Sequence, residues 1–474
     1  MRRSRQAAEG RERPSHSFVT TTVVPSRRFE ARMLLVIAGP LIAAYLADFA
    51  MTLTTKAIVG RLGYRELASI GLAGDLATEI LIIVVGILSV IGVLVAQAEG
   101  SCRKADAGMA ARQGFIVVTV LGIPAAILVW HLDTVLALTG QDPDIIDLMG
   151  PYLHPLAVGL LPLLWFFVLR IFVASLARTG AVMVITLAAV GLNYVLCLGL
   201  VTGVFGLPEL GVAGAGWAKS IVAVLMLLAL FVYTYRTPAF RGYGLFHGRL
   251  KVDLGVCREI FRLGLPVGGL VILEASLFAA VSIFSGILGA VQLAAYHVII
   301  AWVGIAFMTA HGLAEAGMVR VAYAAGRGSI AASRQAGLLT FAMGVTWLTL
   351  LAAIPLNFPE PLVRVFLDPA DPGFDVVLTL TGRLLILAAF FQIFDGLQVM
   401  ASLALRGLKD TIVPLWLGGI GYWVLGIAGG WLLAFPLGMG ADGLWWGMAV
   451  GLIVAGSLLA LRFWLFTRAK VFLT

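Results

Sequence analysis

Several carboxylates interrupt long apolar stretches of this sequence, among them Asp48, Asp75, Glu79, Glu274 and Asp395. A carboxylate at the centre of a membrane-spanning helix costs about 2.5–3.5 kcal/mol to insert, so such residues are rare and functional. In surroundings of low dielectric, a carboxyl group can exchange a proton near neutral pH, and its oxygens can hold Na⁺. These residue types therefore indicate ion binding within a bilayer.

Two of these carboxylates share a position in an internal repeat. Asp48 lies eight residues after Pro40, and Glu274 lies eight residues after Pro266. Asp395 lies in an otherwise apolar stretch. We expect Glu274, Asp395 and Asp48 to bind a coupling ion or the substrate, and Glu274 and Asp395 are the candidate ligands if the ion is Na⁺.

Asp75 and Glu79 are weaker candidates from the N-terminal half. They are four residues apart, so they lie one turn apart on the same helix face. The alternative for every carboxylate is a structural role, in which a buried cation satisfies it. Arg170, Lys56 and Arg383 are the candidate partners for such pairs.

Other polar and aromatic residues in the apolar stretches have simpler explanations. We expect His297 and His311 to hydrogen-bond neighbouring helices, and Asn193 and Gln392 to link helices in the same way. Five aromatic residues could line a cavity for flat cations, but packing or lipid contact is the more usual role: Trp165, Phe166, Phe167, Phe390 and Phe391. The three cysteines, Cys102, Cys197 and Cys257, are scattered and indicate neither a disulfide nor a zinc site.

The composition indicates that membrane-spanning helices position these side chains. Of 474 residues, 61% are hydrophobic and only 12% are charged, whereas soluble domains carry about 25% charged residues. This excludes a soluble enzyme and leaves an all-α polytopic membrane protein. Runs of about 20 apolar residues, the length that spans a bilayer, predict twelve helices near 33–58, 67–97, 114–132, 152–177, 181–203, 212–236, 259–286, 293–322, 337–357, 381–405, 411–436 and 441–467.

The charged residues predict the topology. Lys and Arg concentrate in alternate loops, as in Arg103 and Lys104 after the second span and Arg236 and Arg241 after the sixth. The positive-inside rule then places both termini in the cytoplasm of a multi-pass protein of the cell (cytoplasmic or inner) membrane. Residues 1–32 form a basic cytoplasmic tail, and the net charge of +8 requires no nucleic-acid partner.

The polar linker 237–258 divides the chain into an N-lobe (33–236) and a C-lobe (259–474) of six helices each. Gly60-Arg61-Leu62-Gly63 aligns with Gly286-Ile287-Leu288-Gly289, and Gly100 aligns with Gly326. An even number of spans per half makes the repeat parallel. Transporters built on such repeats place their sites near the midplane and alternate access by rocking the lobes.

Longer motifs resemble the multidrug and toxic compound extrusion (MATE) family, in its bacterial multidrug branch. The segment from Leu263-Gly264-Leu265-Pro266 to Glu274-Ala275-Ser276-Leu277-Phe278 is similar to the family's seventh-helix signature. The segment from Gln392 to Asp395, followed by Leu405-Arg406-Gly407-Leu408-Lys409-Asp410-Thr411, resembles the tenth helix and its loop.

This resemblance implies a secondary antiporter that exports amphipathic, often cationic compounds in exchange for Na⁺ or H⁺. It places Glu274 and Asp395 at the cation-binding positions of the C-lobe. The family often has an aspartate five residues before the glycine that closes the first helix, whereas this chain has Thr55 followed by Lys56. Asp48, two turns earlier, is the candidate replacement.

Two other function classes remain open. A lipid-linked oligosaccharide flippase of the same superfamily would favour cations in its central cavity. A membrane-embedded enzyme would need a nucleophile with a base or a metal cluster, and the sequence has no Walker A motif, zinc pair or nucleophile elbow. We therefore expect no enzyme activity, no cofactor other than the coupling ion, and a monomer that binds lipid and small substrates.

Overall fold

The computed structural model describes residues 24–138, 143–246, 252–367, 369–370 and 373–471. Within these ranges the chain forms helices joined by turns and loops, which confirms the all-α prediction. Most of the basic tail, including Arg2, Arg3 and Arg5, and residues 247–251 of the linker lie outside the described residues.

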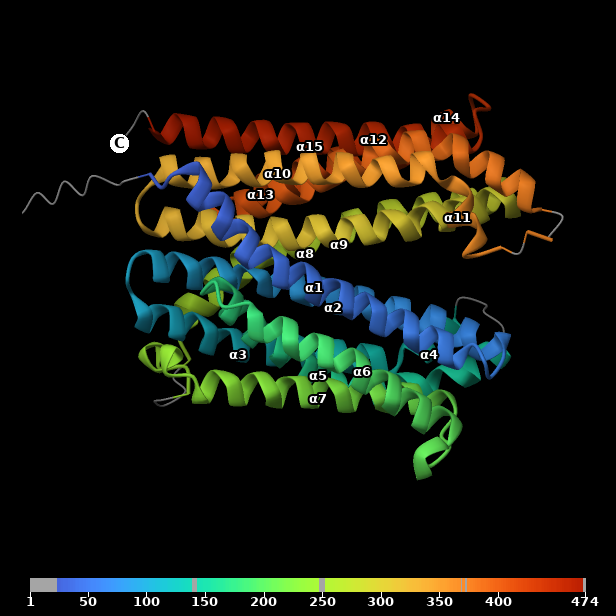
Figure 1. The fold of residues 1–474 in the computed structure, drawn as a ribbon, viewed down its shortest axis with the longest axis horizontal. Helices are drawn as coiled ribbons and strands as arrows, with labels where there is room; N and C mark the ends of the chain where they lie inside the picture. Colours follow the sequence, from blue (N-terminus) through green and yellow to red (C-terminus); the bar gives the residue numbers. More distant parts are fainter. Residues whose placement is uncertain (1–23, 139–142, 247–251, 368, 371–372, 472–474) are drawn as a thin grey trace, which may run out of the picture.

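The first half of the chain supplies six long helices to one lobe (Figure 1). They are α1 (Arg27–Val59), α2 (Tyr64–Gly100), α3 (Lys104–Trp130), α5 (Pro143–Ser175), α6 (Gly180–Thr202) and α7 (Val212–Arg236). Short elements connect them: α4 (Leu132–Ala137), η1 (Val204–Gly206) and η2 (Pro238–Tyr243).

The second half repeats this arrangement. Its long helices are α8 (Leu254–Leu288), α9 (Ala290–Gly326), α10 (Ile330–Asn357), α12 (Phe374–Gly407) and α15 (Ala441–Val471), with the short α11 (Pro359–Arg364). The remaining span consists of α13 (Ile412–Gly419), the π-helix η3 (Ile420–Ala428) and α14 (Gly429–Ala434). In the part of the chain that the structure describes, twelve helical segments are long and apolar enough to cross a membrane.

Several helices extend beyond the apolar runs that predicted them. We expected the first span to begin at residue 33, but α1 begins at Arg27. Ser26 caps it, because its hydroxyl accepts a hydrogen bond from the Phe29 amide. Polar residues continue a helix past the lipid because they are solvated at the interface, so hydropathy underestimates helix length.

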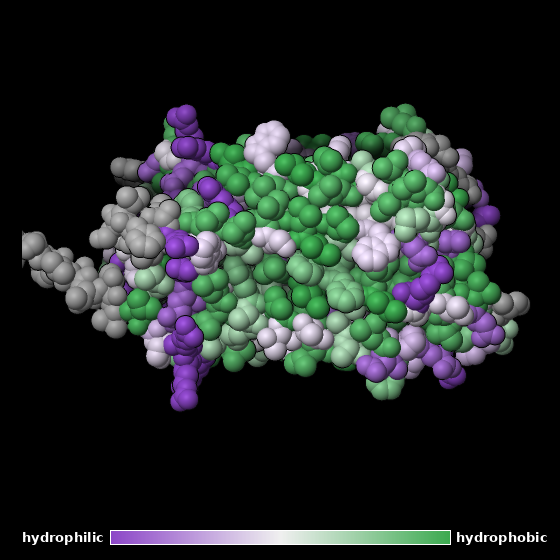
Figure 2. Space-filling model, turned by 90° about the horizontal axis from the view of Figure 1, so that it is seen from above, coloured by the Kyte–Doolittle hydropathy of each residue, from purple (hydrophilic) through white to green (hydrophobic). Residues whose placement is uncertain are grey.

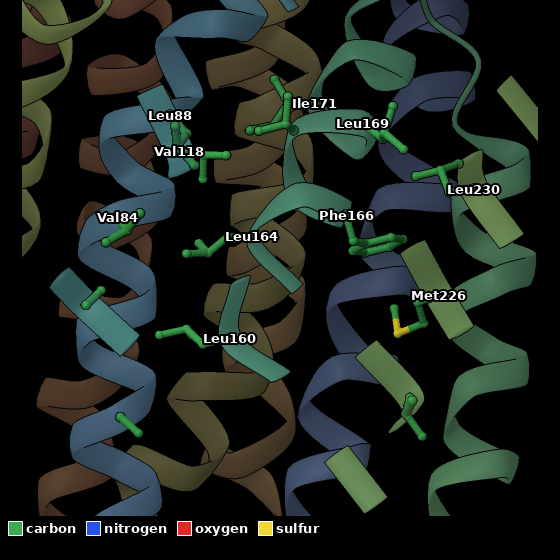
Figure 3. Packing of buried hydrophobic residues seen from close by; sticks show 14 of the residues in the cluster. Val84, Leu88, Val118, Leu160, Leu164, Phe166, Leu169, Ile171, Met226 and Leu230 are labelled. Carbon is green, nitrogen blue, oxygen red and sulfur yellow. The ribbon is translucent and has the colours of Figure 1, made fainter. Parts of the chain in front are cut away.

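Side chains in each lobe interlock between helices. In the N-lobe, Leu88 of α2, Leu164 and Phe166 of α5 and Leu230 of α7 are buried together (Figure 3). The exterior shows a broad apolar belt with hydrophilic residues gathered at the two ends (Figure 2). This distribution is that of a multi-pass membrane protein, whose belt lies against lipid tails.

The internal repeat is visible in matched backbone geometry. Gly63 and Gly289 precede α2 and α9 with φ/ψ values of 161°/168° and 138°/170°. In each case the side chain three residues later, Glu66 or Gln292, folds back over the glycine. The same local structure therefore begins the second helix of each half.

Two matched glycines let the lobes approach each other. A Cβ atom at Gly100 would clash with the carbonyl oxygen of Tyr323, and a Cβ atom at Gly326 would clash with that of Gln97. Gln97 and Tyr323 are themselves equivalent, since both pairs are 226 residues apart. The crossing of α2 and α9 is thus reciprocal, as expected at a pseudo-two-fold axis, and small residues permit the close contact.

The lobes meet mainly at one end, which we call the basic end because Arg27, Arg103 and Arg327 lie there. Arg320 of α9 donates two hydrogen bonds of 2.7 Å to the Glu30 carboxylate of α1, and Gln97 of α2 donates to the carbonyl oxygen of Gly407. Towards the opposite end the lobes diverge (Figure 1). The contacts of α1 and α2 with α8 and α9 therefore act as the base of a V.

We expect Gly100→Ala and Gly326→Ala each to lower the melting temperature of the purified protein by several degrees. The added methyl group overpacks the crossing of α2 and α9, and overpacking typically costs about 1–3 kcal/mol. The control is Gly39→Ala in α1, where the methyl group would meet no atom within 4 Å. Equal melting temperatures for the three variants would contradict the tight crossing.

Candidate ion and substrate sites

The C-lobe brings Glu274 and Asp395 together. Glu274 extends from α8 and Asp395 from α12, and each carboxylate lies within electrostatic range of the other. Asp395 is only 2% exposed, and its Oδ1 has no hydrogen-bond partner among the described residues. Glu274 is half-buried and forms no ion pair in those residues; Arg406 is a cation within its electrostatic range.

Two buried oxygens adjoin this pair. Tyr422, which is fully buried in the π-helix η3, lies within electrostatic range of both carboxylates. Its hydroxyl lies beside the Gln398 side chain, whose carbonyl oxygen has no hydrogen-bond partner in the described part of the chain. Unsatisfied buried polar groups are costly, and an all-oxygen donor set suits a hard cation or a proton. π-Helices are often found at functional sites.

In the N-lobe, by contrast, Asp48 and Asp75 each form an ion pair. Arg170 of α5 donates from Nη1 to Asp48 Oδ2 at 3.0 Å, and the Arg170 side chain is 2% exposed. Lys56 Nζ lies 2.7 Å from Asp75 Oδ1. These are the structural pairs considered from the sequence. Arg383 pairs with Asp442 instead, at 3.0 Å.

Glu79 faces both lobes. It is exposed, and it lies within electrostatic range of Asp75 on its own helix and of Glu274 across the gap. It therefore extends the negative charge of the C-lobe site towards the N-lobe.

A polar chain that sequence reasoning missed links the lobes beside Asp48. Tyr45 of α1 donates a 2.6 Å hydrogen bond to Glu315 of α9, and the Arg170 guanidinium lies 4.4 Å from the centre of the Tyr45 ring. Arg406 donates to Ser89 of α2 at 2.7 Å. Glu315 could have been found in the sequence, because it is a further carboxylate inside an apolar span. Arg406 gives no such signal, because it follows directly after the predicted span 381–405.

The other polar predictions have mixed outcomes. Asn193 donates to Thr55 at 3.3 Å, and Gln392 donates to the carbonyl oxygen of Leu348 at 3.3 Å, so both link helices as expected. For His311 the expectation was wrong: Nδ1 has no partner among the described residues, and the ring packs edge-on against Tyr45 at 5.0 Å. Edge-on packing against an aromatic ring takes the place of the expected hydrogen bond. His297 packs edge-on against the Tyr296 ring at 5.5 Å.

The aromatic residues mainly pack. Trp165 donates to Thr119 of α3, and Phe391 is buried against Trp445. The Arg170 guanidinium lies 5.4 Å from the centre of the Phe167 ring. The cation over this aromatic ring therefore belongs to the protein and not to a ligand. The three cysteines are free thiols.

Comparison with known proteins agrees with this architecture. The chain is 37% identical over 434 residues to a probable multidrug resistance protein NorM of Pseudomonas putida, covering 92% of this chain and 94% of that protein. It is 36% identical to the protein of the same name from Rhizobium meliloti, with the same coverage.

Solved structures share the fold. A eukaryotic MATE transporter, AtDTX14, superposes with a TM-score of 0.82 at 23% identity, covering 94% of this chain and 99% of that one. A MOP superfamily transporter from Pyrococcus furiosus superposes with a TM-score of 0.84 at 18% identity, covering 93% and 96%.

The MatE family model matches twice, at residues 40–198 and 266–432. The matches begin at Pro40 and Pro266, the residues that aligned the two halves of the sequence. With both halves matched and relatives above one-third identity along most of its length, the chain belongs to the MatE family.

Proposed function

We propose that this protein is an ion-coupled antiporter that exports amphipathic, often cationic compounds across the cell membrane. The observation that carries the proposal is the carboxylate pair of Glu274 and Asp395, which has no ion-pair partner in the described residues. Membership of the MatE family and relatives named as probable multidrug resistance proteins support the same function.

In the transport cycle that we propose, the carboxylate pair binds both the ion and the substrate. Na⁺ or H⁺ entering from the end where the lobes diverge binds at Glu274 and Asp395 and reduces their combined negative charge by one. A cationic substrate competes for the same charge, so ion and substrate bind in turn. One net elementary charge moving through 100 mV releases about 2.3 kcal/mol, so exchange of one ion for a substrate without net charge sustains roughly a fifty-fold gradient. Exchange of one ion for a monovalent cation moves no net charge and is driven by the concentration gradient of the ion.

Sidedness follows from the charges. The basic end, where the lobes touch, faces the cytoplasm under the positive-inside rule, with both termini on that side. The diverging end then faces outward. We propose that this single chain contains both lobes of the transport unit and functions as a monomer with a basic tail (1–32), N-lobe (33–236), linker (237–258) and C-lobe (259–474).

The flippase alternative is less well supported. It would favour cations in the central region for a pyrophosphate group, but Arg170 and Lys56 are paired with Asp48 and Asp75. The C-lobe site is acidic, which favours cations over phosphates.

We expect Glu274→Gln and Asp395→Asn each to abolish efflux of a fluorescent cation from cells, because the coupling ion loses its ligand. Substrate accumulation would then rise towards the roughly fifty-fold limit that one charge sustains. The control is Asp106→Asn, a surface carboxylate paired with Arg103. Efflux retained by both C-lobe variants at normal expression would refute the site.

The coupling ion can be named in proteoliposomes. We expect uptake of a fluorescent cation to respond to an imposed Na⁺ gradient or to an imposed pH gradient, tested separately, and the response to be absent in Asp395→Asn. Uptake driven by neither gradient would contradict secondary antiport.

Tyr45→Phe should loosen the base of the V. A hydrogen bond to a charged group contributes about 1.5–3 kcal/mol, so its loss should shift the conformational equilibrium roughly tenfold towards the state closed at the opposite end. Spin labels at the exposed positions Leu138 and Val365, in a background lacking Cys102, Cys197 and Cys257, should then report a larger population at short distance.

The matched control is Tyr235→Phe, which removes a hydroxyl from an exposed ring of α7. A distance distribution in Tyr45→Phe that is identical to that of the control would show that the contact between Tyr45 and Glu315 does not hold the lobes.

A further inference from the structure

A small polar pocket in the N-lobe is separate from the carboxylate pair described above. Residues of α1, α2, α5 and α7 line it, including Lys56, Asp75, Tyr152 and Lys219. Its cavity volume is about 10 Å³, which is room for about one water-sized group, and the pocket is partly open. A space of this size admits a single oxygen atom at the end of a larger molecule.

The charges of this pocket do not balance. Lys56 and Asp75 neutralise each other at 2.7 Å. Lys219 forms no ion pair with any carboxylate that the structure describes; its ammonium lies 5.9 Å from the centre of the Tyr152 ring. The pocket therefore carries a net charge of +1 from two lysines and one aspartate.

Two groups that can donate hydrogen bonds line the pocket beside the ion pair of Lys56 and Asp75. The Lys219 ammonium can donate three hydrogen bonds, and the Tyr152 hydroxyl, which lies against Gly74, forms none within the described residues. By contrast, Thr55 is engaged, since it donates to the carbonyl oxygen of Met51 and accepts from Asn193. An ammonium and a phenol that converge on a half-enclosed space match a carboxylate group.

The opposite lobe has the opposite charge. Glu274 and Asp395 of the C-lobe lack a basic ion-pair partner, and Glu79 adds negative charge between them and the N-lobe. A molecule with a cationic group and a carboxylate would satisfy both lobes at once.

We propose that the pocket of Lys219 and Tyr152 binds the carboxylate of zwitterionic amphipathic substrates. This inference rests on the proposed efflux function and adds a specificity site to it. The C-lobe carboxylates receive the cationic end of such a substrate, and Lys219 distinguishes zwitterions from simple cations.

The test uses one rhodamine dye as its free carboxylic acid and as its ethyl ester. The two share a cationic ring system and differ only in the carboxylate. We expect Lys219→Gln to raise the KM for export of the acid roughly tenfold, as for loss of one charge-assisted hydrogen bond, and to leave the KM for the ester unchanged. Tyr152→Phe should act in the same direction, and Lys219→Arg should restore discrimination.

The matched control is Lys104→Gln. Lys104 also has its ammonium over a tyrosine ring, 5.7 Å from the centre of Tyr243, but it lies at the basic end. Its replacement should change neither KM. Equal loss of both dyes in Lys219→Gln would show a structural role and overturn the proposal, and so would an unchanged KM for the acid.

A free anion is the other source of the same chemistry, and repeating the assay with gluconate in place of chloride separates the two. Export of the ester that depends on chloride in the wild type but not in Lys219→Gln would identify chloride as the occupant and overturn the proposal. If the wild type exports neither dye, the antiport function itself fails; if it exports the ester alone, only the carboxylate site fails.

Discussion

A charged group inside lipid has no water to solvate it, so its burial has a high free-energy cost. The arrangement of charged side chains in this molecule follows from that cost. The N-lobe meets this cost by pairing for two of its carboxylates, because Arg170 holds Asp48 and Lys56 holds Asp75, while Glu79 and Lys219 form no ion pair within the described residues. In the C-lobe the negative charge is not compensated, because Glu274 and Asp395 have each other as neighbours and no ion-pair partner in the described residues. A mobile ion can compensate a charge of this kind, and this is the basis on which we propose the pair as the site for Na⁺ or H⁺.

The remaining polar groups connect this chemistry to movement of the lobes. Tyr45 and Glu315 join α1 to α9, and Arg406 joins α12 to α2 through Ser89. Arg406 also lies within electrostatic range of Glu274. In the antiport mechanism that we propose, a charge that binds at the carboxylate pair acts on a residue that holds the lobes together. This short path is our proposed link between ion binding and lobe contact.

Much of the fold could be predicted because a bilayer restricts the alternatives so strongly. Apolar runs of sufficient length must be helices, since every backbone group in lipid needs a partner within its own segment. The repeat followed from Pro40, Pro266 and matched glycines, and the structure shows why those glycines are needed: at Gly100 and Gly326 the backbones touch. Helix ends were less predictable, because hydropathy detects the lipid-facing length and not the helix that continues beyond it, as at Arg27.

The sequence by itself determined that this is a membrane protein of two similar halves and indicated most of the carboxylates that interrupt its apolar spans, although Glu315 was missed. The membrane spans follow from transfer of single residues into lipid, and the halves follow from the internal repeat. Only the tertiary structure decided which charges are paired. Asp48 and Glu274 are equivalent in the repeat, yet one is bound by Arg170 from a helix 122 residues away and the other is not. The roles inferred for Glu315, Tyr422 and Lys219 likewise depend on which groups surround them in the folded structure. A partner is set by how helices from distant parts of the chain pack, and spacing along one helix cannot encode that.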